Sequence, residues 1–145
     1  MSGKLIFSEI SGDLFSSPPE FALAHCVTTS MVMGAGIARV FKSRFGRVQE
    51  LKDQNVQVGG VAVLKHEKRY IYYLVTKDKL YGKPKYEDLK STLQEMKKHM
   101  VANGVTKLAI PKIGCGIDGL DWDKVKQVLH DVFDDEAMEI VVYVL

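Results

Sequence analysis

A glycine-rich loop that carries one carboxylate follows an apolar run in the last third of the chain. The run 107–110 is strand-like, and the loop after it contains Gly114, Gly116 and Gly119 together with Asp118. Backbone N–H groups made accessible by glycines, next to the start of a helix, form a site for an anion such as phosphate. A carboxylate inside an anion site is electrostatically unfavourable, so the presence of Asp118 needs an explanation. A catalytic role is one candidate.

A second loop of the same kind lies upstream. The run 22–27 resembles a short buried strand, and a segment with two glycines, 34–37, then opens a helical pattern. Two strand–glycine–helix junctions could hold a diphosphate from both sides. The segment does not match the dinucleotide motif G-x-G-x-x-G, because Arg39 occupies the place of the third glycine, and no G-x-x-x-x-G-K-[ST] loop is present. Glycines also make ordinary tight turns, so the pattern alone leaves both interpretations open.

Three further polar side chains, Asp13, Thr28 and Lys77, lie just past predicted strand ends. Ligands of open α/β sheets bind at the carboxyl ends of the strands, which makes these residues candidates for a site. Each also has an ordinary explanation. Most lysines are solvated surface groups, and Asp13 after Gly12 equally fits an Asx turn.

Neither metal binding nor thiol chemistry is indicated. The four histidines are scattered without ligand spacing, and the two cysteines, Cys26 and Cys115, form no C-x-x-C pair. Cys115 lies between glycines before a helix, where the pKa of a thiol can fall. A free cysteine is more commonly a small buried apolar residue, and a catalytic one needs a histidine partner that the sequence does not identify.

The composition is that of an ordinary globular protein. The chain has 145 residues, 46% hydrophobic and 26% charged, which suits one domain spanning 1–145. A net charge of +2, from 20 basic and 18 acidic residues, argues against strong non-specific binding of nucleic acid, although it leaves room for local basic patches. We expect no direct sequence-specific binding. The absence of signal-peptide and membrane-length patterns predicts an intracellular protein, nuclear or cytoplasmic, without membrane contact. We expect a monomer.

Hydrophobic periodicity predicts alternating strands and helices, hence a three-layer α/β/α domain. The hairpin within 61–75 makes the central sheet mixed. Asp121 is a plausible N-cap, and Asn103-Gly104 a helix stop. The expected strands are 5–10, 22–27, 61–64, 70–75, 107–110 and 139–145, and the expected helices are 35–54 with a break at Gly46, one that begins near Tyr86, and 122–133.

These segments together resemble the macrodomain family, and within it the branch of terminal ADP-ribose protein glycohydrolases. The resemblance covers nearly the whole chain, and the combination is specific although each piece is weak. The matching segments are 12–15, 23–26, 33–38, 45–46, 48–51, 61–65, 69–74, 76–77, 83–84 and 111–118.

The resemblance implies an ADP-ribose site that needs no cofactor and no metal. Lys77 corresponds to the family nucleophile and Asp118 to its acid/base partner. Thr28 would lie near the distal ribose, where the branch usually has a serine. The remaining implied contacts are Asp13, Leu14, Tyr143 and Leu145 around the adenine, and two phosphate loops formed by Gly34, Ala35, Gly36 and Ile37 and by Lys112, Ile113, Gly114, Cys115, Gly116 and Ile117.

The segment 28–30 departs from the commoner macrodomain hydrolases, which carry an asparagine for the distal ribose there. This departure argues against their water-mediated mechanism and for a mechanism in which a lysine is the nucleophile. A neutral Lys77 amine would displace the carboxylate of a ribose ester, and Asp118 would move protons. A nearby diphosphate and carboxylate favour charged lysine, whereas desolvation favours neutral lysine, and proton transfer to Asp118 would resolve the conflict.

The resemblance therefore implies removal of ADP-ribose from glutamate or aspartate side chains of ADP-ribosylated proteins. Deacetylation of O-acetyl-ADP-ribose in the same site is a related possibility. The alternative is a module that binds ADP-ribose without turnover, because many macrodomains only bind and fold does not decide function.

Overall fold

The computed structural model describes residues 4–78, 82–116 and 118–145. Its regular elements agree closely with those expected from hydrophobic periodicity. In chain order they are β1 (Ile6–Ser11), the 3-10 turn η1 (Leu14–Ser16), β2 (Ala22–Thr28), α1 (Gly36–Phe45), α2 (Val48–Asp53), β3 (Val61–His66), β4 (Arg69–Lys77), α3 (Tyr86–Ala102), β5 (Lys107–Ile110), α4 (Trp122–Phe133) and β6 (Glu139–Val144).

The strands of the described residues form one sheet in the order β1-β6-β5-β2-β4-β3. Every neighbouring pair is parallel except β3 with β4, which form the antiparallel hairpin. The mixed sheet is therefore confirmed. Because five strands run in the same direction, their carboxyl ends share one edge of the sheet, here called the carboxyl edge, and their amino ends share the other, the amino edge.

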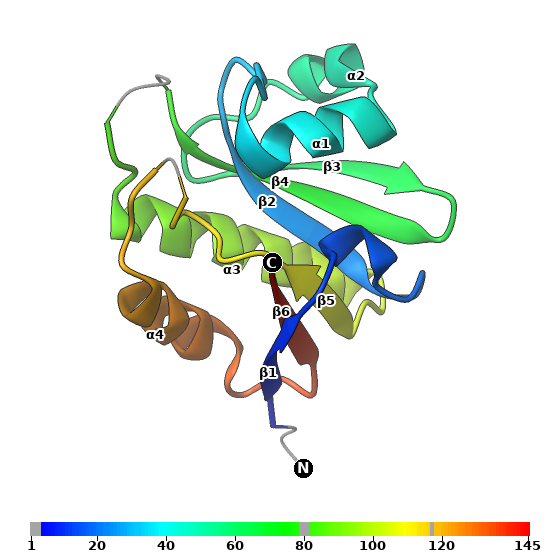
Figure 1. Ribbon diagram of the computed structural model, residues 1–145, viewed down its shortest axis with the longest axis vertical. Coiled ribbons are helices and arrows are strands. Elements are labelled where there is room, and N and C mark those ends of the chain that lie inside the picture. The colour runs from blue at the N-terminus through cyan, green and yellow to red at the C-terminus, as the bar shows by residue number, and fades with distance from the viewer. Residues whose placement is uncertain (1–3, 79–81, 117) are drawn as a thin grey trace.

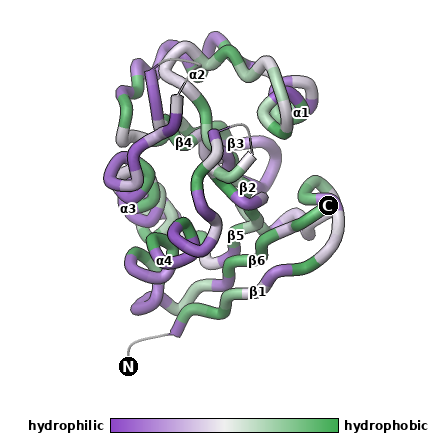
Figure 2. Tube along the Cα trace, turned by 60° about the vertical axis from the view of Figure 1, so that its left-hand side comes forward, coloured by the Kyte–Doolittle hydropathy of each residue, from purple (hydrophilic) through white to green (hydrophobic). Residues whose placement is uncertain are grey.

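Helices cover both faces of the sheet, as Figure 1 shows, and this gives the three layers expected. Buried residues of α3 and α4, such as Leu93 and Leu129, pack in one apolar core against one face. Phe41 of α1 and Leu51 of α2 belong to a second core on the other face. In Figure 2 the strands β5 and β6 are mostly hydrophobic, as expected for strands that are covered on both sides.

Glycine and its neighbours set the helix ends. The expected break in the first helix is confirmed at Gly46, which has φ 55°, followed by Arg47 at φ 54°. Asn103 caps α3, and Gly104 takes φ 67° after it, a left-handed conformation that glycine adopts without steric cost. Among the described residues, no helix is both long and apolar enough to cross a membrane.

Candidate active site

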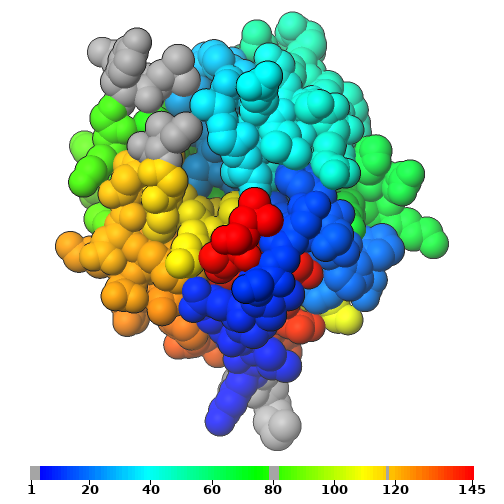
Figure 3. Space-filling model, viewed as in Figure 1, coloured from blue at the N-terminus to red at the C-terminus, as the bar shows by residue number. Residues whose placement is uncertain are grey.

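The candidate residues predicted at strand ends converge on the carboxyl edge. Thr28 and Lys77 are the last residues of β2 and β4, and the loop that follows β5 carries Asp118. Asp13 follows β1, and Leu145 follows β6. In Figure 3 the C-terminal residues lie centrally on this face, with the segments after β1, before α1 and after β5 around them.

Lys77 and Asp118 form the only close pair of opposite charges among the described candidate residues. Lys77 Nζ lies 2.6 Å from Asp118 Oδ1, and the two side chains are only 13% and 19% exposed. Lys77 Nζ also donates a hydrogen bond to the carbonyl oxygen of Gly82 at 2.9 Å. An amine and a carboxylate at this distance, largely shielded from water, can exchange a proton directly. The pair therefore has the geometry needed for a nucleophile and its proton acceptor.

Thr28 lies beside this pair. It is the register partner of Lys77 across β2 and β4, and a bulge between Val27 and Thr28 shifts the pairing there. Its hydroxyl is 2.9 Å from that of Ser30, and the residue is 7% exposed. The backbone N–H of Thr29 donates to the carbonyl of Lys77 at 3.1 Å, which fixes the two strand ends to each other.

The loop before α1 presents the start of a helix without a side-chain cap. Ala35 is the N-cap residue, its side chain makes no capping hydrogen bond, and the first turn contains no acidic residue. Helix starts of this kind favour anions, because the first N–H groups lack partners within the helix. Gly34, Ala35 and Gly36 are exposed, and Ile37 is partly buried against the core.

Two methionines hold this loop in a conformation that the sequence pattern did not reveal. Met31 and Met33 have positive φ, 56° and 48°, yet are 2% and 5% exposed. Positive φ costs a residue with a side chain about 1–2 kcal/mol. Burial of the two side chains in the core beneath α1 offsets that cost, so the conformation of this loop is fixed by apolar packing as well as by glycine.

The loop after β5 folds back on itself. Leu120 donates its N–H to the carbonyl of Gly114 at 2.8 Å, and Gly114 has φ 73°. Ile113 is buried at 2% exposure and Gly114 is buried as well, whereas Lys112 and Gly116 are exposed. Ile117, which the resemblance also implies, lies outside the described residues.

The helix after this loop differs from α1. The Asp121 side chain accepts a hydrogen bond from the N–H of Asp123 at 3.0 Å, which confirms the predicted N-cap. A negative side chain therefore already occupies the start of α4. Of the two helix starts that the sequence offered as anion sites, α1 is the one whose cap residue makes no side-chain hydrogen bond.

The cysteines show no sign of activation. Burial raises the pKa of the Cys26 thiol to about 12 and also raises that of Cys115, which donates to the carbonyl of Ile113 at 3.4 Å. A nucleophilic cysteine needs a lowered pKa. Cys115 therefore fits the small, partly buried residue that was the commoner expectation. The described residues contain no group of His, Cys, Asp or Glu able to hold a metal ion.

The residues expected around adenine lie at the neighbouring ends of β1 and β6. Asp13 is exposed, and its carboxylate accepts a hydrogen bond from the Phe15 N–H at 2.9 Å, as the Asx-turn alternative predicted. Leu14 is buried, Tyr143 is partly buried against the same core, and Leu145 is fully exposed. A single oxygen makes the turn contact, so the capping role and a ligand role for Asp13 are compatible.

Sequence reasoning missed two residues, one that contacts Lys77 and one that contacts the end of the loop that carries Asp118. Gly82 supplies the carbonyl that accepts from Lys77, and the Tyr86 hydroxyl accepts from the N–H of Asp121 at 3.0 Å. The sequence marks Tyr86 only as the beginning of an expected helix. Its position at the first turn of α3, directly after a loop, was the available signal.

Comparison with known proteins identifies the family to which this chain belongs. A family model described as Macro domain matches residues 24–129, and the chain belongs to that family. The ADP-ribose glycohydrolase OARD1 of Homo sapiens is 49% identical over 136 residues, 94% of this chain and 90% of the human protein. The resemblance to the terminal ADP-ribose protein glycohydrolase branch is thus confirmed.

Two comparisons with Thermus aquaticus agree. Its DNA ADP-ribosyl glycohydrolase is 30% identical over 144 residues, 92% of this chain but 40% of that protein. The solved macrodomain of its DarG superimposes with a TM-score of 0.85 at 28% identity, covering 97% of this chain and 99% of that one. The macrodomain fold is therefore established for this chain.

Proposed function

We propose that this protein binds ADP-ribose and hydrolyses the bond between ADP-ribose and a glutamate or aspartate side chain of a modified protein. The observation that carries the proposal is the 2.6 Å contact between Lys77 Nζ and Asp118 Oδ1 at the carboxyl edge. A module that only binds has no need for an amine and a carboxylate held together there. Relatives named ADP-ribose glycohydrolase and DNA ADP-ribosyl glycohydrolase support the hydrolytic part.

The bound ADP-ribose would extend along the carboxyl edge. Its adenine would lie by Asp13 and Tyr143, and its diphosphate between the open start of α1 and the loop 112–117. Its distal ribose would then reach Thr28, next to Lys77. The order of strands supports this direction, because β1 and β6 are neighbours at one end of the sheet while β2 and β4 are neighbours towards the other.

Lys77 would act as the nucleophile. Its amine attacks the anomeric carbon of the distal ribose, and the bond from that carbon to the carboxylate oxygen breaks with the electron pair leaving on oxygen. Carboxylates leave without protonation because their conjugate acids have a pKa near 4. Asp118 takes the proton that Lys77 must lose and then transfers protons in two later steps: the ring opening that gives a Schiff base, and the hydrolysis of that Schiff base by water to free ADP-ribose and amine.

The same arrangement would accept O-acetyl-ADP-ribose, whose acetyl ester also has a carboxylate leaving group. When the acetyl ester is on the anomeric oxygen, Lys77 attacks the same anomeric carbon, acetate leaves with the electron pair, and water releases ADP-ribose from the Schiff base as before. We keep this as a secondary activity, because the contact between Lys77 and Asp118 supports nucleophilic attack in general without selecting one ester.

The proposal is tested with a protein mono-ADP-ribosylated on glutamate and a matched protein modified on serine. The glutamate conjugate should be cleaved and the serine conjugate should not, because a serine alkoxide is a much poorer leaving group than a carboxylate. Borohydride added during turnover should attach ADP-ribose covalently to Lys77, as detected by mass spectrometry. Asp118→Ala should form this adduct but release it slowly. Cleavage of the glutamate conjugate with no trapped adduct would exclude the lysine route.

A further inference from the structure

Two adjoining hollows lie far from the charged pair, at the amino edge of the sheet. They have volumes of about 550 and 670 Å³ and share Pro19, Lys68 and Arg69 in their linings. We call the combined feature the amino-edge groove. Arg69 and Lys77 stand eight residues apart on β4, which places their backbones roughly 26 Å from each other at about 3.3 Å per residue.

The groove concentrates positive charge. Its lining includes five basic residues, Arg44, Lys65, Lys68, Arg69 and Lys107, against two acidic ones, Glu20 and Glu67. The chain as a whole carries a net charge of only +2. The groove therefore holds more net positive charge than the entire protein, and the remainder of the molecule is slightly negative. Such a local basic stripe attracts a polyanion.

Several of these cations lie over aromatic rings. The Arg44 guanidinium is 4.7 Å from the Phe15 ring centre, and Lys65 Nζ is 5.2 Å from that of Tyr70. Lys107 Nζ is 5.6 Å from the ring centre of Phe21 and also forms a long ion pair with Glu20 at 3.9 Å. Contacts with rings leave the positive charge uncompensated and available to phosphate groups.

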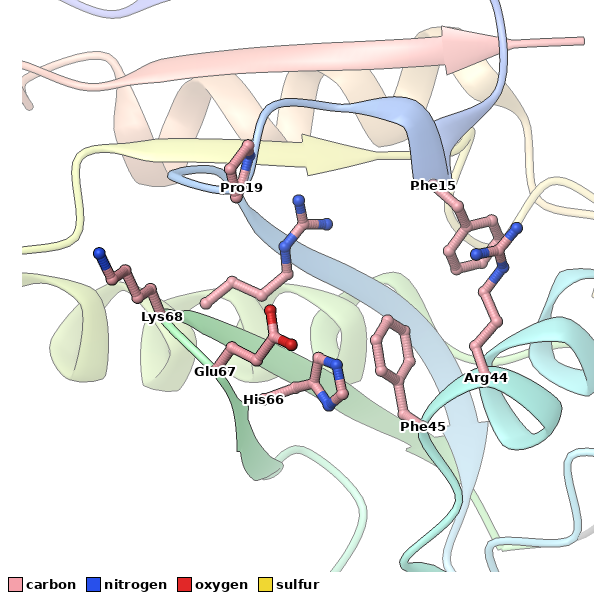
Figure 4. A pocket seen from close by; sticks show the side chains of 8 residues that line it. Phe15, Pro19, Arg44, Phe45, His66, Glu67 and Lys68 are labelled. Atoms are coloured by element: carbon pink, nitrogen blue, oxygen red, sulfur yellow. The ribbon is translucent and has the colours of Figure 1, made fainter.

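The first hollow also offers ring surfaces of its own. Figure 4 shows Phe45 and His66 side by side in its wall, and their ring centres are 5.1 Å apart. Phe15 lines the same hollow, next to Arg44. Cations beside accessible rings are what a flexible strand of nucleotides requires, because phosphates bind the cations and unpaired bases stack on the rings.

We propose that the amino-edge groove binds single-stranded nucleic acid without sequence preference. A duplex would hide its bases from the rings, and an acidic peptide would use the charges but leave the rings without a stacking partner. The proposal is independent of the hydrolytic function, since it uses no residue assigned to the ADP-ribose site.

The test compares two double variants with the same change of charge. Lys65→Glu/Lys68→Glu reverses two groove lysines, and Lys90→Glu/Lys98→Glu reverses two exposed lysines of α3 that line neither hollow. Fluorescence anisotropy with labelled oligo(dT) and oligo(U) gives the affinity as a function of salt. The groove variant should bind at least about tenfold more weakly, and its salt slope should fall by about 1.4, since each phosphate contact contributes about 0.7.

The control variant should retain the wild-type affinity, and ADP-ribose binding by the groove variant, measured by calorimetry, should be unchanged. Phe45→Leu, which keeps an apolar side chain but removes the ring, should weaken binding of both oligonucleotides and leave their salt slope intact. Comparing oligo(dT) with oligo(U) distinguishes DNA from RNA as the better ligand. Equal losses in the two double variants, or equally tight binding of polyglutamate, would overturn the proposal.

Discussion

The two edges of the sheet carry charged residues in different arrangements. At the carboxyl edge Lys77 and Asp118 are 2.6 Å apart and largely shielded, so the two charges compensate each other. At the amino edge five basic side chains line one groove with two acidic ones, and Arg44 and Lys65 rest on rings. The first arrangement suits proton transfer, and the second suits attraction of a polyanion.

The comparison shows that the amino-edge groove and the charged pair occupy different parts of the sheet. The two hollows described at the amino edge contain neither Lys77 nor Asp118. The carboxyl edge is identified instead by the convergence of strand ends from β1, β2, β4, β5 and β6. Parallel strands bring their loops to one side, which is why sites of open α/β sheets occur there.

The largest expected effect is the loss of turnover when Lys77 at the carboxyl edge is replaced. Lys77→Ala should reduce kcat for the glutamate conjugate by at least about 10³-fold while ADP-ribose affinity changes little, because a nucleophile contributes along the reaction path. Lys77→Arg should be equally inactive, since a guanidinium stays protonated. Single-turnover kinetics with calorimetry of ADP-ribose measures both quantities. Full activity in either variant would leave water activated by Asp118 as the surviving mechanism.

The next largest effect separates ligand binding from turn formation at Asp13. Asp13→Ala removes a charged acceptor for the adenine amino group and should weaken ADP-ribose binding by about 1.5–3 kcal/mol. It also removes the cap on the Phe15 N–H, which costs about 1 kcal/mol of stability. Asp13→Asn keeps an acceptor for that N–H and should recover stability more than affinity. Calorimetry that finds equal affinity in all three proteins would remove Asp13 from the site.

A pair of glycines in one loop provides a finer test of the carboxyl edge. A Cβ at Gly116 would meet no atom within 4 Å, whereas at Gly114, with φ 73°, it would lie 2.8 Å from Leu120 Cδ1. Gly116→Val should therefore keep its Tm but lose about tenfold or more in ADP-ribose affinity, because it crowds the phosphates. Gly114→Val should lower Tm by several degrees. If Gly116→Val binds normally, the loop is only a turn.

The last expected effect changes stability and leaves the ADP-ribose site untouched; it concerns His25 of β2. His25 is 1% exposed, stacks on Phe41 at 3.8 Å, and has no hydrogen-bond partner for either ring nitrogen among the described residues. Burial lowers its pKa from 6.5 to about 3. Between these values the unfolded chain binds one more proton, so the free energy of unfolding should fall by about 1.4 kcal/mol per pH unit as pH drops below 6.5.

Urea unfolding at several pH values between 7 and 5 measures this dependence. His25→Phe keeps a ring to stack on Phe41 and removes the titrating group, so its stability should vary less with pH than that of the wild type. Parallel pH profiles for the two proteins would show that His25 does not cause the acid sensitivity.

Much of the fold was predictable because its signals are local. The strand 107–110, the helix 122–133 and its Asp121 cap match the structure residue for residue. The helix break at Gly46 was predictable too, since glycine adopts positive φ without strain. The candidate site residues could be identified from the sequence because they lie in glycine-rich loops or are polar residues at strand ends. Their contacts with a ligand remain predictions.

The sequence by itself determined the order of strands and helices and the presence of an amine and a carboxylate after strand ends, because periodicity and turn chemistry act over a few residues. Tertiary structure decided the rest. It placed Lys77 beside Asp118 although 41 positions separate them in the chain. It set Met31 and Met33 at positive φ through core burial. It also brought basic residues from positions 44 to 107 together in one groove. No local sequence pattern predicts this groove, because it depends on how segments distant in the chain pack together.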